Sequence, residues 1–182
     1  MSREAFGAPA MLEARYRQAQ LLRNGRSIEI RALRPGDRAA LIAAVERTSA
    51  QSLYRRFFSP KRHFSEEEIG YFVDVDFVNH VALVATLEEG GRPIIVGGAR
   101  YVVVRPARAE VAVAVVDRYQ GQGIGAALLQ HLVMIARSAG LKQLIAEVLA
   151  DNTPMLRVFE RSGLPVTTMR EGGLTHVVLE LQ

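Results

Sequence analysis

The chain has 182 residues, of which 49% are hydrophobic and 23% charged, as is typical of globular domains. Its net charge is +4, but the basic residues are scattered, so we interpret them as a solvated surface and predict no nucleic-acid partner. It has no cysteine, which excludes disulfides, a thiolate nucleophile and thiolate-bound zinc. Because it shows neither a long apolar run nor a signal-like start, we predict a cytoplasmic protein without a membrane segment.

The first part of the chain predicts a strand pair followed by three helices. Asn24-Gly25 separates two extended segments and is typical of a tight hairpin turn with positive φ at both positions. The third helix begins after Ser65, and Glu68 stands three residues on, which is the spacing of a capping box. The expected elements are strands at 20–23 and 27–30 and helices at 37–47, at 50–58 and after 65.

The second part predicts further strands and two more helices. Apolar residues recur with the helical period between Ile124 and Ala139, and Gly140 is a natural stop. The expected strands are 80–87, 94–104, 111–116, 143–149, 166–169 and 175–181, with glycine pairs at 90–91 and 172–173 and a last helix at 152–162. A meander combined with crossovers indicates an α/β (α+β) fold, with a mixed, mostly antiparallel central sheet of about seven strands and helices on both faces.

A glycine-rich turn between a strand and a long helix carries the clearest chemical signal. Gly121, Gly123 and Gly125 let the backbone approach a ligand closely, and the N–H groups at a helix start favour an anion such as pyrophosphate. A dinucleotide fold would place G-x-G-x-x-G after its first strand, and a P-loop would end in Gly-Lys-Ser/Thr, whereas Gly125 is followed by alanine. A glycine turn without a ligand is the remaining alternative.

Gln120-x-x-Gly123-x-Gly125 resembles the pyrophosphate-binding signature of the GNAT acetyltransferase superfamily. The stretch at 152–163 resembles the second cofactor segment of that family. The resemblance implies a GNAT fold with a splayed cofactor cleft in one domain at 18–182, after an extension at 1–17. It implies acetyl-CoA as co-substrate and no metal, which fits four histidines without metal spacing. The cofactor-binding residues implied are Val113, Ala114 and Val115 through their main chain, Gln120, Gly121, Gln122, Gly123, Ile124, Gly125 and Ala126 in the loop, and Asn152, which is also a suitable helix N-cap.

The segments 23–26, 30–37, 52–58 and 75–85 resemble the bacterial protein-lysine acetyltransferases of the Pat group. This implies acetyl transfer to a lysine of a protein, and the partner that the resemblance implies is an AMP-forming acyl-CoA synthetase. Glu-Val-Ala at 110–112 resembles the segment that carries that group's catalytic glutamate, which implies Glu110 as the catalytic residue. A lysine amine with a pKa of about 10.4 needs such a general base.

Several alternatives accompany this hypothesis. Glu147 is a second candidate base, and Tyr54 and Tyr119 are candidate acids, since Phe159 stands where many GNAT enzymes have a tyrosine. Substrate-binding roles fall on Tyr54, Arg55 and Arg56, whose guanidinium groups would meet an acidic protein surface or form a structural salt bridge. A small-molecule amine acetyltransferase and a non-catalytic acyl-CoA sensor are the competing functions. The sequence leaves the choice between monomer and homodimer open.

Overall fold

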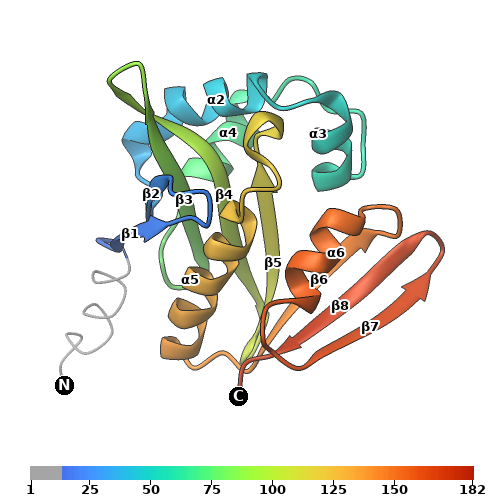
Figure 1. The fold of residues 1–182 in the computed structure, drawn as a ribbon. Coiled ribbons are helices and arrows are strands. Elements are labelled where there is room, and N and C mark those ends of the chain that lie inside the picture. Colours follow the sequence, from blue (N-terminus) through green and yellow to red (C-terminus); the bar gives the residue numbers. More distant parts are fainter. Residues whose placement is uncertain (1–13) are drawn as a thin grey trace.

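The computed structural model describes residues 14–182, and Figure 1 shows their fold. The strands are β1 (Arg17–Leu21), β2 (Ser27–Ala32), β3 (His80–Glu89), β4 (Arg92–Arg105), β5 (Arg108–Val115), β6 (Gln143–Leu149), β7 (Val166–Glu171) and β8 (Leu174–Glu180). The helices are α2 (Arg38–Glu46), α3 (Ala50–Phe57), α4 (Glu66–Val73), α5 (Ile124–Ser138) and α6 (Thr153–Glu160), with short 3-10 turns η1 (Pro35–Asp37) and η2 (Asp117–Tyr119). Most of the predicted 1–17 extension lies outside the described residues.

The described strands form one sheet in the order β1-β2-β3-β4-β5-β6-β8-β7. Strands β5 and β6 are parallel, and every other neighbouring pair is antiparallel. The predicted mixed, mostly antiparallel sheet is therefore confirmed, with eight strands in the described part of the chain where about seven were expected.

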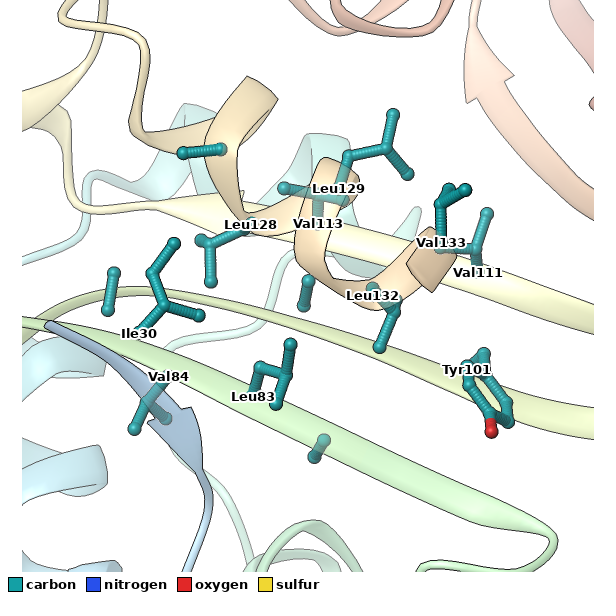
Figure 2. Close-up of a cluster of buried hydrophobic side chains, with 14 of the residues drawn as sticks. Ile30, Leu83, Val84, Tyr101, Val111, Val113, Leu128, Leu129, Leu132 and Val133 are labelled. Carbon is teal, nitrogen blue, oxygen red and sulfur yellow. The ribbon is translucent and has the colours of Figure 1, made fainter. Parts of the chain in front are cut away.

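The sheet is covered on both sides. In Figure 1, α5 and α6 lie in front of the sheet and α4 lies behind it. Side chains alternate along a strand, so Val111 and Val113 of β5 turn toward α5, where Figure 2 shows Leu128 and Leu132 beside them. Glu110 and its neighbour across the ladder, Val102, belong to the opposite face. No described helix has the length and apolar character needed to span a membrane.

The glycine-pair turns are confirmed, but the first hairpin differs from its prediction. Both residues of Gly90-Gly91 have positive φ, as a two-residue primed turn requires. In the first hairpin β1 ends at Leu21, and the chain turns through a longer loop in which Leu22 N donates to Arg26 O at 2.8 Å. Gly25 alone of the Asn-Gly pair adopts a positive φ there. The predicted hairpin is therefore confirmed, and the prediction of a turn with positive φ at both positions is wrong.

Strand β5 begins three residues earlier than predicted. Ala107 adopts φ 61° and closes a two-residue turn after β4 that the sequence pattern concealed, because alanine rarely takes this conformation. Glu110, which was expected at the start of this strand, is therefore its third residue and pairs with Val102. The capping box predicted at Ser65 is confirmed, since Glu68 N donates to Ser65 Oγ and Ser65 N donates to Glu68 Oε2.

Candidate active site

The two parallel strands at the centre of the sheet separate halfway along their length. Strand β5 pairs with β6 only at Arg108, Ala109 and Glu110, and β5 then runs on to Val115. Beyond Glu110, a cavity of about 730 Å³ lies between the strands and extends under α3. The splayed cleft predicted from the family resemblance is present, and Glu110 stands where the strands part.

The glycine-rich turn lines one end of this cavity. Gly121 and Gly123 have φ 74° and 90°, a region that suits glycine. No hydrogen-bond acceptor is found within residues 14–182 for the N–H groups from Gly121 to Ala126, and the first intrahelical bond at this end is Ala127 N to Gly123 O. These N–H groups and the positive end of the α5 dipole together favour a bound anion. The loop therefore fits the pyrophosphate of acetyl-CoA.

The main chain of β5 presents polar groups to the gap at alternate residues. Val116 N donates to Val96 O on the β4 side, so Ala114 also directs its polar groups to β4, and those of Val113 and Val115 face the gap. The carbonyl of Val115 already accepts a bond from Gln120 Nε2 at 3.0 Å. Of the three predicted residues, Val113 is thus the best placed to hydrogen bond a ligand through its main chain.

The side chains of the two glutamines of the loop form hydrogen bonds with other residues of the protein. Gln120 donates to Val115 O and, at 3.2 Å, to Ser52 Oγ of α3. The Oε1 atom of Gln122 accepts from Asn24 Nδ2 at 3.1 Å and lies 3.5 Å from Arg26 Nη1. These side chains hold the loop in shape, which leaves its backbone as the part that can contact a ligand.

The segment after β6 forms the opposite wall. Asn152 lines the cavity and is the N-cap of α6, because its Oδ1 accepts from Met155 N at 3.4 Å. The N-cap role is therefore observed, and a contact between Asn152 and the pantetheine arm stays a prediction. Phe159 is fully buried on the same helix and supplies no proton donor.

Glu110 faces the side of the cavity formed by α3. Its side chain is solvent-exposed and lines the cavity together with Arg55 and Arg56. Burial lowers the pKa of Arg56, and the negative charge of Glu110 opposes that shift, so the two groups interact across the cavity. Tyr54 is 44% exposed and is not among the described residues that line the cavity.

The other candidate acid and base have partners of their own. Glu147 lies 3.3 Å from His176 Nδ1. The hydroxyl of Tyr119 donates to Glu89, and this bond, aided by burial, raises the pKa of Tyr119. The contact with His176 makes Glu147 a weaker candidate base than Glu110, and the raised pKa of Tyr119 makes it a poor proton donor. Among the described residues, no group of three or more histidines and carboxylates is placed to hold a metal ion.

A hydrogen-bonded cluster that the sequence did not suggest links the loop to α3. The carboxylate of Asp117 accepts from Ser49 N and Ser49 Oγ, both at 2.7 Å, and from Ser52 Oγ at 2.9 Å. Ser49 is the N-cap of α3, and Asp117 lies three residues before Gln120. The helix that carries Arg56 is therefore anchored to the turn that begins the glycine loop.

The comparisons with known proteins agree with this geometry. The model of the acetyltransferase (GNAT) family matches residues 47–164. Acetyltransferase Pat of Mycolicibacterium smegmatis is 33% identical over 144 residues, which are 78% of this chain but 42% of that protein. The chain thus spans less than half the length of this relative.

Two solved structures share the fold. The GNAT domain of S. lividans PAT has 32% identity and a TM-score of 0.82, over 90% of this chain and 96% of that one. The yncA protein of Salmonella typhimurium, solved with acetyl-CoA, has 22% identity and a TM-score of 0.69, over 85% and 94%. At that identity the likeness to yncA shows the fold alone.

Proposed function

Because the chain belongs to the GNAT family of acetyltransferases, we propose that it transfers the acetyl group of acetyl-CoA to a lysine amine of a protein, with Glu110 as the general base. Acetyl-CoA supplies the acyl group as a thioester. The observation that carries the proposal is the position of Glu110 at the point where β5 and β6 part, in the same cavity as the glycine loop.

Different residues of the cavity bind the acetyl donor and the acceptor amine. The N–H groups from Gly121 to Ala126 bind the pyrophosphate, and the main chain of Val113 orients the arm that ends in the thioester. The acceptor amine enters from the α3 side, and Glu110 takes its proton directly or through a water molecule. The neutral amine then attacks the acetyl carbonyl and the thiolate leaves. Direct transfer suits a chain without cysteine, because it needs no acylated thiol.

Placing both partners in one cleft supplies a large part of the acceleration. An amine held beside the thioester reacts as if in one molecule, which removes the entropy cost of an encounter. Protonation of the leaving thiolate falls to solvent, because Phe159 is buried and has no hydroxyl.

A protein acceptor is supported by the similarity to two Pat proteins. By the family resemblance, we propose an AMP-forming acyl-CoA synthetase as the first partner to test, and the cytoplasm as the place of the reaction. The two cavity-lining arginines of α3, Arg55 and Arg56, give the acceptor side a positive charge that suits an acidic protein surface.

The test measures free CoA release and lysine acetylation with a purified acyl-CoA synthetase and, separately, with a panel of small amines. Glu110→Gln removes the base and keeps the shape, so we expect a loss of about 100-fold or more in kcat with acetyl-CoA affinity unchanged. Glu160→Gln, at an exposed glutamate of α6 outside the cavity, is the matched control and should retain full activity.

The outcomes separate the competing hypotheses. Acetylation of a small amine alone would replace the protein acceptor and keep the acetyl transfer. Binding of acetyl-CoA without any turnover would favour an acyl-CoA sensor. Full activity of Glu110→Gln would show that Glu110 is not the general base.

A further inference from the structure

Two arginine side chains line the acceptor side of the cavity, and neither forms an ion pair with a carboxylate of residues 14–182. Arg56 comes from α3 and Arg100 from the middle of β4, and both are partly buried and line the cavity. Neither guanidinium takes part in an ion pair among residues 14–182. Within the same part of the chain, the side chain of Arg56 makes no hydrogen bond, and its observed neighbour is the ring of Phe57.

The partners of Arg100 are neutral. Its Nη1 lies 2.9 Å from His80 Nε2, and its Nη2 donates to Phe72 O at 3.2 Å. Burial, together with the charge of Arg100, lowers the pKa of His80 to about 4. The imidazole is therefore neutral at physiological pH and accepts the bond from Arg100. Neither partner cancels the positive charge of the guanidinium.

The two positive charges act on each other through a poorly solvated region. Burial, and then the charge of Arg56, lowers the pKa of Arg100 to about 10. The negative charge of Glu110 opposes the lowering of the pKa of Arg56 by burial. One exposed carboxylate cannot neutralise two guanidinium groups, and in the proposed reaction Glu110 must stay free to accept a proton. The cluster therefore lacks one negative charge.

Aromatic rings hold both arginines in place. The guanidinium carbon of Arg56 lies 4.7 Å from the centre of the Phe57 ring, and that of Arg100 lies 4.9 Å from the centre of the Phe72 ring. Phe57, Phe64 and Phe72 contact one another edge to face or tilted. Stacking covers the flat faces of a guanidinium and leaves its N–H edge for a ligand, and that edge matches a carboxylate.

We propose that Arg56 and Arg100 bind a carboxylate of the acceptor, so that the substrate of this enzyme is an amine with a carboxylate close to it. The carboxylate would compensate the two arginines and place the neighbouring amine beside Glu110. The same chemistry is offered by an acidic side chain next to the target lysine of a protein and by the carboxylate of a free amino acid. This inference rests on the proposed function and specifies its acceptor.

The kinetic test compares acceptors that differ only in this carboxylate. One pair is a lysine peptide with glutamate or glutamine beside the lysine, and the other is free lysine and lysinamide. We expect kcat/KM to favour the acid by about 10- to 100-fold in one of the pairs, as for a lost charge-assisted hydrogen bond. The peptide pair would identify a protein acceptor, and the lysine pair a small one.

Substitutions of the two arginines test whether they cause the preference for the acceptor with a carboxylate. Arg56→Gln and Arg100→Gln should reduce the acid-to-amide ratio of kcat/KM to about threefold or less, because each variant slows the acid acceptor more than the amide acceptor. Arg56→Lys should retain part of it, because the charge stays and the fork geometry is lost. Arg170→Gln, at an exposed arginine of β7 outside the cavity, is the control. Equal rates with acid and amide in the wild-type enzyme, or a preference that survives in both glutamine variants, would overturn the proposal.

A binding measurement keeps the inference separate from the proposed function. Glutarate, a dicarboxylate without an amine, is titrated into the protein saturated with CoA, so that the glycine loop is already occupied. Binding that weakens about tenfold or more in Arg56→Gln, but not in Arg170→Gln, supports the carboxylate site even if no acceptor is acetylated. Absence of glutarate binding to the correctly folded wild-type protein refutes it even if acetyl transfer is found.

Discussion

Asp117 ties the glycine loop to α3 with three hydrogen bonds, and Asp117→Asn is the change that tests this link most directly. The amide keeps the size of the carboxylate but loses its charge and one of its acceptor oxygens. Ser49 N can only donate, so one former bond must become a weaker bond to a neutral oxygen or an unfavourable contact with the new NH₂ group.

The expected cost follows from the partial burial of Asp117. A hydrogen bond to a charged group contributes about 1.5–3 kcal/mol when buried, and solvent screening at this half-buried site reduces that to about 1–2 kcal/mol. For a chain of this length, such a loss lowers Tm by about 2–8 °C. Because α3 carries Arg56, we also expect KM for the acceptor to rise several-fold.

The pH dependence gives a sharper check than the melting temperature alone. Burial would raise the pKa of Asp117, but the hydrogen bonds from Ser49 and Ser52 outweigh it and hold the pKa below its ordinary value of 3.8. A carboxylate whose pKa is lower in the folded protein than in the unfolded chain stabilises the fold at pH values above the unfolded-state pKa. This stabilisation is lost as the pH falls through the folded-state pKa. The gap between wild type and variant should therefore be full at pH 7 and shrink below about pH 4.

Thermal unfolding followed by circular dichroism between pH 3 and 7 measures this gap. Asp151→Asn makes the same chemical change at an exposed aspartate and should leave Tm within about 1 °C. An equal Tm for wild type and Asp117→Asn at pH 7, or a gap that does not change with pH, would show that the carboxylate does not anchor α3.

Three further changes test other parts of the structure. Gly123→Ala places a side chain at φ 90°, so we expect about 1–2 kcal/mol of strain and a loss of CoA binding in calorimetry. The control is Gly173→Ala, at φ 82° in a remote turn, which should be strained in the same way but bind CoA normally. Gly97→Ala brings its Cβ to 3.0 Å from Ala114 O, and chemical denaturation should show a loss of about 1–3 kcal/mol. Asp37→Ala removes the partner of a salt bridge at 2.7 Å with side chains 12% and 11% exposed, and should cost about 3–5 kcal/mol in the same assay.

The sequence predicted best those features that a single short segment determines. The glycine loop, the start of α5 and the capping box at Ser65 depend on residues within a few positions of one another, and each is found as expected. Ala107 shows the limit of local rules, because an alanine with positive φ has no signature and its turn shifted the start of β5.

Features built from distant segments could not be predicted in this way. Arg56 and Arg100 are 44 positions apart and line one cavity with Glu110 because α3 and β4 both border it. The one sequence signal for Arg100 was a charge in the middle of an otherwise apolar strand. Ser49 and Asp117 are 68 positions apart, and neither residue type in isolation indicates a contact.

The short ladder between β5 and β6 has a consequence for how the molecule opens. It joins the two halves of the sheet at three residue pairs, whereas β3 and β4 pair at ten. Local opening of β6, β8 and β7 away from the rest should therefore need less free energy than unfolding of the whole domain, and their amide protons should exchange with solvent sooner. A ligand that spans the gap bonds to both halves and opposes that opening, so slower exchange in β6 would report its binding even before any acetyl group is transferred.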